Sequence, residues 1–335
     1  MKLIRKITFP FVPIYYVATR LRNTLYDLGI KKSTSYDFPI ICVGNLSVGG
    51  TGKTPMVEYL INLLKDDYKV AALSRGYKRK TKGFQVGNEA STVDALGDEP
   101  FQFYNKFKDE VVVAVDSDRN NGIQALRSLP NKPEVIVLDD AFQHRKVKAG
   151  LNILLTAYNH LYAEDFVLPT GNLREPRHGA KRAHIIVVTK CPIDLNENDK
   201  SNIIKQLNVE KQQHVFFSFI NYDESVYSLE GSLKLEDLND FALVTGIANA
   251  NTLIQYLKHK DLKFEHLNYS DHHNFSKEDI QMLETKALII TTEKDFMRLK
   301  QYESLKNKLF YLPIRIHIDN EPKFNKLVKD FCKDA

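Results

Sequence analysis

Uninterrupted runs of apolar residues recur along the first two thirds of the chain and predict buried strands. They lack the alternation of apolar and polar positions that a strand with one wet face shows, which is typical of a parallel sheet covered on both faces. Helical stretches at 55–67 and 119–129 lie between them, as in an open α/β sheet. The predicted strands cover residues 38–45, 69–75, 111–115, 134–140, 151–155 and 184–190.

A different pattern begins at residue 214. The stretch 214–231 is aromatic and alternating and is interrupted by Asn-Tyr-Asp-Glu, which predicts a two-stranded β-ribbon. Shorter apolar runs with helices between them follow, as in a second, smaller α/β unit. A chain of 335 residues suits about two domains. We therefore predict an N-terminal segment over 1–35, a phosphate-loop domain over 36–213, a β-ribbon linker over 214–235 and a smaller α/β domain over 236–335.

The N-terminal segment changes the meaning of the charge balance. Residues 1–35 carry seven Lys and Arg against one Asp, a net charge of +6, whereas the whole chain carries +5, so the remaining 300 residues sum to −1. A basic, nucleic-acid-binding body is therefore not expected. Apolar residues from Pro13 to Leu28 share one helical stripe, which is typical of a helix on an anionic membrane surface or of a first helix packed on its own domain. Both can hold at once.

Composition excludes two further classes. No apolar run in the sequence reaches the roughly 18 residues of a membrane span. The three cysteines, Cys42, Cys191 and Cys332, lie far apart without metal-ligand spacing, which favours free thiols in a reducing compartment.

The stretch SVGGTGKT at residues 47–54 departs from the phosphate-loop pattern G-x-x-x-x-G-K-[ST] only at its first position. It follows a predicted strand and runs into a predicted helix, as such a loop requires. Its backbone N–H groups would cradle phosphate oxygens, Lys53 would bridge the β and γ phosphates, and the Thr54 hydroxyl would ligate Mg²⁺. A serine at the first position need only mean that the chain enters the turn without a left-handed residue. The predicted nucleotide-binding residues are Ser47, Val48, Gly49, Gly50, Thr51, Gly52, Lys53 and Thr54.

Two carboxylates, Asp139 and Asp140, end the apolar strand predicted over 134–140. Alone they could be solvated strand-end residues, but beside a phosphate loop they form the Walker B pattern, in which one of them holds Mg²⁺ directly or through water. The guanine-reading pattern N/T-K-x-D is incomplete: TKCP has Pro192 where the Asp is needed, and TEKD at 292–295 lacks the intervening residue. ATP is therefore the expected nucleotide.

A kinase also needs a group that accepts or orients the proton of the acceptor hydroxyl. Asp98 and Glu99 of LGDEP stand in a turn after the second predicted strand, on the edge where such sheets bind ligands. DHHNFS at 271–276 offers two histidines in the second domain that could face the nucleotide. Asp98 could instead be a helix-start carboxylate, and His272 or His273 a surface residue.

Taken in order, these and further motifs closely resemble the tetraacyldisaccharide 4′-kinase family of lipid A biosynthesis over about residues 38–300. They are GNLSVGGTGKTP, LSRGYKRK, GDEP, LDDAFQHR, LPTGNLREPR, VVTKCP, VTGIANA, DHHNFS and TTEKD. The resemblance implies an ATP- and Mg²⁺-dependent kinase that phosphorylates the 4′-hydroxyl of a tetraacylated glucosamine disaccharide 1-phosphate. It also implies two α/β/α domains joined by a β-ribbon. The enzyme would sit peripherally on the cytoplasmic face of the bacterial inner membrane, docked by its N-terminal helix.

The same resemblance assigns roles to individual residues. Asp98 matches the catalytic carboxylate, His272 its histidine partner and Lys53 the phosphate-loop lysine, while Thr54, Asp139 and Asp140 match the metal side. The partners implied are the glycolipid and the membrane surface, without nucleic acid or an obligate protein partner. Further active-site candidates are Glu99, Gln143, His144, Arg75, Arg119 and Arg174.

Two alternatives remain at this point. A regulatory or chaperone-type phosphate-loop NTPase would couple hydrolysis to a protein partner, although Val48 replaces the signature lysine of KGGxGKT loops. A soluble small-molecule kinase would use the N-terminal helix only as a structural element. An acceptor-dependence assay separates these from the glycolipid kinase.

Overall fold

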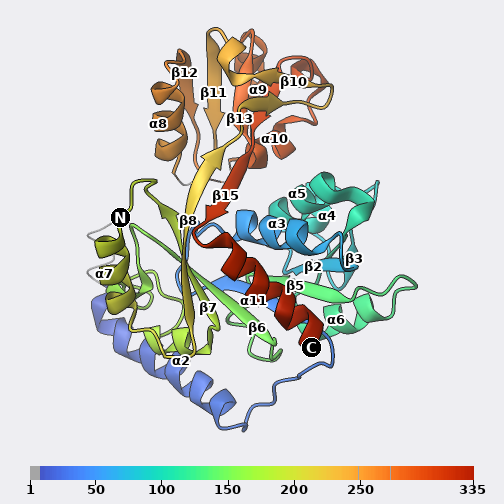
Figure 1. Ribbon diagram of the computed structural model, residues 1–335. Helices are drawn as coiled ribbons and strands as arrows, with labels where there is room; N and C mark the ends of the chain where they lie inside the picture. Colours follow the sequence, from blue (N-terminus) through green and yellow to red (C-terminus); the bar gives the residue numbers. More distant parts are fainter. Residues whose placement is uncertain (1–7, 248, 272) are drawn as a thin grey trace. The chain divides into compact units, whose positions relative to one another are not determined.

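A computed structural model describes residues 8–247, 249–271 and 273–335 of the chain. The chain folds into two compact units, one comprising the chain up to Ile220 together with Ile316–Ala335, and the other Asn221–Arg315. Each unit has its own mixed α/β architecture (Figure 1). The predicted fold class is thereby confirmed.

The larger unit is built on a nine-stranded sheet in the order β15-β8-β7-β6-β1-β5-β2-β4-β3. The strands from β8 to β4 pair in parallel, and β3 adds an antiparallel edge. The six predicted strands correspond to β1, β2, β4, β5, β6 and β7. The strands are β1 Ile40–Asn45, β2 Val70–Ser74, β3 Gln85–Val86, β4 Val112–Val115, β5 Val135–Asp139, β6 Leu151–Ala157, β7 Ile185–Cys191, β8 His214–Tyr222 and β15 Ile314–Ile318.

Helices cover both faces of this sheet, which explains the near-continuous apolar character of its strands. Side chains of α3, α5 and α11 pack on one face, and those of α6 and α7 pack on the other. Figure 1 shows α3 and the red α11 on the same side of the strands. The helices of this unit are α2 Val12–Asp27, α3 Lys53–Leu64, α4 Val93–Leu96, α5 Asp98–Phe107, α6 Arg119–Arg127, α7 Glu197–Leu207 and α11 Glu321–Asp334.

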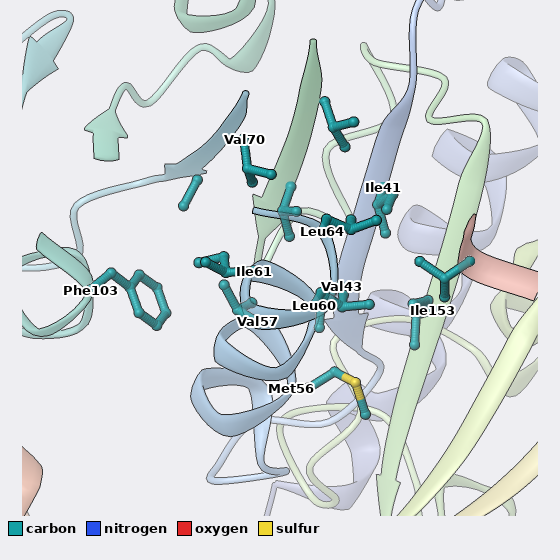
Figure 2. Close-up of a cluster of buried hydrophobic side chains, with 14 of the residues drawn as sticks. Ile41, Val43, Met56, Val57, Leu60, Ile61, Leu64, Val70, Phe103 and Ile153 are labelled. Carbon is teal, nitrogen blue, oxygen red and sulfur yellow. The ribbon is translucent and has the colours of Figure 1, made fainter. Parts of the chain in front are cut away.

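Helix α3, which leads away from the phosphate loop, is held by its apolar face. Met56, Val57, Leu60, Ile61 and Leu64 recur at helical spacing and are fully buried. Figure 2 shows Leu60 and Leu64 beside the strand residues Val43 and Ile41, with Val57 and Ile61 on the side of the helix toward Phe103. The position of the loop is therefore fixed by a rigid strand before it and a buried helix after it.

Helix α2 has one packed face and one exposed face. Its Tyr15 hydroxyl donates to the backbone oxygen of Arg174 at 2.9 Å, and the buried Asn23 amide donates to Glu175 at 2.5 Å, so one face packs on the larger unit. The opposite face leaves Ile14, Val17 and Leu21 between 57% and 68% exposed. Among the described helices, none is long and apolar enough to cross a bilayer.

The smaller unit has a six-stranded sheet in the order β10-β9-β14-β13-β11-β12, in which β14, β13, β11 and β12 are parallel. Its strands are β9 Ser225–Tyr227, β10 Ser232–Lys234, β11 Phe241–Thr245, β12 Phe264–Asn268, β13 Ile289–Thr292 and β14 Leu309–Leu312. Its helices are α8 Asn251–His259, α9 Lys277–Glu284 and α10 Glu293–Leu299. The parallel strands again place their carboxyl ends at one edge.

The domain boundaries differ from the predicted ones at two points. Residues 316–335, predicted to belong to the second domain, belong to the larger unit, because Phe324 and Val328 of α11 are fully buried in its core. The strands of segment 214–235 also pair outside it: β8 lies between β7 and β15, and β9 pairs with β10 and β14. The chain passes between the units in β8 and again at β15, and an alternating pattern does not reveal which strand is the partner.

Candidate active site

The phosphate loop of residues 47–54 follows β1 with the backbone that a nucleotide site needs. Left-handed conformations fall at Gly49 (φ 108°) and Gly52 (φ 81°), where glycine carries no steric penalty. Ser47 instead forms an antiparallel bridge to Leu173, and the Val48 N–H donates to Asn172 O at 2.8 Å. The serine that breaks the sequence pattern thus extends a strand into the loop.

Lys53 lies among acceptors at the carboxyl end of the sheet. Its ammonium is 3.7 Å from an Asp140 carboxylate oxygen and donates to Asn45 Oδ1 at 3.3 Å. Arg174 donates to both Asp140 oxygens, at 2.9 and 3.0 Å. Burial alone would raise the pKa of Asp140, but Lys53 and Arg174 together outweigh it and hold that pKa below its usual value. Asp140 is therefore ionised.

The pKa of Asp139 is shifted in the opposite direction, upward. This side chain is buried at the end of β5 and accepts a hydrogen bond from the Ser74 hydroxyl at 3.0 Å. Burial and the charge of Asp140, opposed by the charge of Lys53, raise the pKa of Asp139 to about 6. A cation beside Asp139 would favour its ionised form. This carboxylate is consequently the one whose charge a bound metal would change most.

Arg119 acts beneath this acidic pair. It is only 2% exposed, and its guanidinium donates to the backbone oxygens of Asp116 at 2.9 Å and Asp139 at 3.3 Å. Arg119, predicted as an active-site residue, thus supports the backbone at the end of β5. Arg75 is exposed at the end of β2, and its charge contributes to lowering the pKa of Arg119, after burial.

Gln143 connects the loop to a buried acid that the sequence reasoning missed. Its amide donates to Asn45 O at 2.8 Å and to Glu175 Oε1 at 3.0 Å. Glu175 is 2% exposed and also accepts from Asn23 and from Arg182, at 2.5 and 2.8 Å. Glu175 lies within the motif LREPR, between Arg174 and Arg177. A carboxylate between two arginines was the one feature of the sequence that could have indicated its part in this network. This network ties α2 to the phosphate loop.

His144 is a neutral group at the rim of the site. Burial and the nearby Arg119 lower its pKa to about 4, although Asp118 lies 3.9 Å away. Its Nε2 is buried without a hydrogen-bond partner. An imidazole in this state can donate or accept a hydrogen bond at neutral pH but carries no charge.

Asp98 and Glu99 form the first turn of α5, at the edge of the sheet that carries the phosphate loop. Gly97 precedes them with φ 93°, and a Cβ there would lie 2.9 Å from Tyr77 O, so only glycine lets the turn contact the chain after β2. The charge of Glu99 contributes to raising the pKa of Asp139, which places the two carboxylates in electrostatic contact. Both helix-start and active-site readings of Asp98 are consistent with this position.

The second histidine motif lies in the smaller unit. His272 lies outside the described residues. His273 is engaged: its Nε2 is 2.8 Å from Asp279 Oδ2, and its ring packs on Tyr269. Asp279 also accepts from the Ser276 N–H in the capping box of α9. His273 therefore belongs to the local structure around α9.

The donors present suit a magnesium ion that shares its coordination with phosphates and water. Asp139, Asp140 and the Thr54 hydroxyl offer the hard oxygen ligands that Mg²⁺ prefers. Within the described residues no three His, Cys, Asp or Glu side chains form a ready-made metal cage. Magnesium at nucleotide sites usually takes one or two carboxylates together with substrate phosphates, so the two observations agree.

A parallel α/β sheet with this loop, this lysine and a carboxylate-ended neighbouring strand defines the class of phosphate-loop NTPase-like kinases. Comparison with known proteins specifies it further. A family model described as Tetraacyldisaccharide-1-P 4′-kinase (LpxK) matches residues 4–333. The chain belongs to this family of kinases in lipid A biosynthesis.

Individual relatives agree along the whole length. The chain is 51% identical over 340 residues to Tetraacyldisaccharide 4′-kinase of Flavobacterium johnsoniae, covering 100% of this chain and 99% of the relative. It is 44% identical over 351 residues to the kinase of the same name from Phocaeicola vulgatus, covering 98% and 96%. A crystal structure of LpxK from Aquifex aeolicus in complex with ATP has a TM-score of 0.80 at 33% identity, covering 98% of this chain and 99% of that one.

Proposed function

We propose that the protein transfers the γ-phosphate of ATP to the 4′-hydroxyl of a tetraacylated glucosamine disaccharide 1-phosphate. The observation that carries the proposal is the phosphate loop with Lys53 set against the ionised Asp140, in a chain that belongs to the 4′-kinase family. The ATP-bound relative from Aquifex aeolicus supports the choice of nucleotide.

The residues around the loop divide the work of phosphoryl transfer, which consists mostly of positioning and charge stabilisation. Loop N–H groups and Lys53 bind the phosphates. Thr54 and an Asp139 or Asp140 carboxylate would hold Mg²⁺, which would offset negative charge on the phosphate oxygens. Arg174 holds Asp140 in place, and Arg119 supports the backbone of Asp139.

For the acceptor side, Asp98 removes or orients the proton of the 4′-hydroxyl, with His272 as its partner. The family resemblance supports His272, and the engagement of His273 by Asp279 supports the same choice. A His272→Ala variant is expected to lower kcat, whereas His273→Ala is expected to lower the unfolding temperature with a smaller effect on kcat.

The exposed apolar face of α2 serves as the membrane contact at the cytoplasmic face of the inner membrane. Ile14, Val17 and Leu21 would enter the headgroup region, and basic side chains such as Arg20 would meet anionic lipids. The glycolipid can then reach the site without leaving the bilayer.

An assay with γ-labelled ATP in mixed detergent micelles tests the proposal. The label is expected to move to the tetraacylated disaccharide 1-phosphate, with little release of free phosphate when no acceptor is present. A Lys53→Ala variant, which loses the phosphate-binding charge, should transfer at least about 10²-fold more slowly. Acceptor-independent hydrolysis by the unaltered protein would instead support a regulatory or chaperone-type NTPase.

A further inference from the structure

The order of strands gives a bound triphosphate a direction. The phosphate loop follows β1, and β5, which ends in Asp139, and then β2, which ends in Ser74, lie on one side of it. Lys53 and Asp140 meet on that side. If the γ-phosphate lies there, the nucleoside extends over the other side of β1, where β6 and β7 end.

Two consecutive residues at the end of β7 bind two consecutive carbonyls of the loop. The Thr189 hydroxyl donates to Thr51 O at 2.9 Å, and the Lys190 ammonium donates to Gly50 O at 2.6 Å. Thr189 is buried, whereas Lys190 is exposed. The lysine thus reaches the loop from its solvent side, on the flank away from Asp140.

The backbone at this point is adapted to Lys190. It has φ 58°, a left-handed conformation that is uncommon for a residue with a side chain, and the pairing of β7 with β8 shifts register between Val188 and Cys191. Such irregularities often re-aim a side chain at a strand end. The next residue, Cys191, points inward, and its thiol donates to Val188 O.

We infer that Lys190 forms the nucleoside wall of the nucleotide site, with its ammonium fixed on Gly50 O and its four-carbon stem packed against the face of the base. This inference rests on the proposed ATP-binding function. Lysine stems pack well on flat apolar surfaces while the charged end remains solvated or hydrogen-bonded. Pro192 stands where guanine-reading motifs have a carboxylate, so this motif does not supply the usual acceptor for a guanine edge.

Electrostatics agree with a position beside the phosphates. Although the residue as a whole is exposed, partial desolvation of its ammonium against the loop lowers the pKa of Lys190, and the charge of Lys53 lowers it further. The apolar stem of Lys190 would contact the base and not the phosphates. Its contribution can therefore be measured by comparing ligands with and without a base.

Calorimetric titration with two ligands tests the inference. MgATP and magnesium tripolyphosphate share the phosphates, but only MgATP has a base. Lys190→Ala is expected to weaken MgATP binding about tenfold, as for loss of a base-packing contact, and to change tripolyphosphate binding less than about twofold. Lys190→Met, which keeps an unbranched apolar chain, should recover most of the MgATP affinity. Lys205→Ala, an exposed lysine of α7, is the matched control.

The outcomes separate the inference from the function on which it rests. Equal weakening of both ligands in Lys190→Ala would mean that the lysine only braces the loop, and a Met variant as weak as the Ala variant would exclude packing of the stem. Unchanged MgATP binding in Lys190→Ala would also contradict the inference. Failure of the unaltered protein to bind MgATP would overturn the proposed function and the inference together.

Discussion

Two adjacent aspartates at the end of β5 have pKa values shifted in opposite directions because their neighbours differ. Asp140 faces Lys53 and Arg174, whereas Asp139 is enclosed beside Ser74, with a pKa raised to about 6. The sequence predicted the pair but left open which of them holds the metal. The geometry favours Asp139 as the residue that gains most from a cation, since Asp140 already has two cationic partners.

Asp98→Asn tests the acceptor side of the site. Asparagine keeps the size of the side chain and still suits the start of a helix, but it cannot take up a proton. We expect kcat to fall roughly 10²-fold or more, as for loss of a general base, with little change in KM for ATP. Steady-state kinetics in mixed micelles give both constants. A kcat within a few-fold of the unaltered enzyme would remove Asp98 from this role.

His144 predicts a dependence of stability on pH. Its folded-state pKa of about 4 lies below the ordinary 6.5, so the unfolded chain binds more protons between these values. The free energy of unfolding should therefore fall as pH falls from 6.5 to 4. Asp139 acts with the opposite sign, because its raised pKa makes the folded state lose stability as pH rises from 3.8 to about 6.

Comparing the unaltered protein with His144→Asn separates the two groups, because Asp139 is common to both. The free energy of unfolding is measured for both proteins by urea denaturation. As pH falls below 6.5, the unaltered protein should lose up to about 1.4 kcal/mol per pH unit more than the His144→Asn variant. A difference independent of pH would show that His144 is not held neutral by the fold.

Among the elements, α2 has one face packed and one face exposed. Hydrogen bonds from Tyr15 and Asn23 and an ion pair from Asp27 to Arg145 at 2.7 Å attach it to the larger unit. On the apolar face, Ile14, Val17 and Leu21 are exposed. Sequence periodicity predicted the stripe, but both a core face and a membrane face give the same periodicity.

Replacing Ile14, Val17 and Leu21 together with serine tests the membrane face of α2. Because these side chains are exposed, the unfolding temperature should change little, whereas binding to vesicles of anionic phospholipid should weaken at least about tenfold. Co-sedimentation with the vesicles measures this. Substitution of the exposed Thr24 on the same helix is the matched control. Unchanged sedimentation of the triple variant would exclude this face as the membrane contact.

For the molecule as a whole, the sequence predicted the class of fold, six strands of the larger sheet and the phosphate loop, because each is a local pattern. It assigned residues 316–335 to the second domain and missed the contacts that Glu175 and Lys190 make around the phosphate loop. These depend on contacts between distant segments: Glu175 meets Asn23, and Lys190 meets Gly50. The spacing of strands and the residues at turns are local features, so they do not predict contacts between segments far apart in the sequence.

The return of the chain to the larger unit makes a prediction about its stability. Phe324 of α11 is fully buried. Its ring packs edge-to-face with those of Phe216 and Tyr59, at centroid distances of 5.2 and 5.7 Å. Phe324→Ala should lower the free energy of unfolding by about 3–5 kcal/mol. Urea denaturation followed by circular dichroism measures the loss, and Lys323→Ala, at an exposed neighbouring position, should change it little. A loss below about 1 kcal/mol would contradict a structural role for α11 in this unit.

The position of the transferred phosphate tests the proposed 4′-kinase activity most directly. The purified protein is incubated with MgATP and the tetraacylated disaccharide 1-phosphate, and the product is examined by phosphorus and proton NMR, with a 4′-deoxy acceptor as control. A new phosphomonoester coupled to the proton at C4′, absent with the control, is the predicted result. A phosphate at another position, or equal consumption of ATP with the 4′-deoxy acceptor, would contradict transfer to the 4′-hydroxyl.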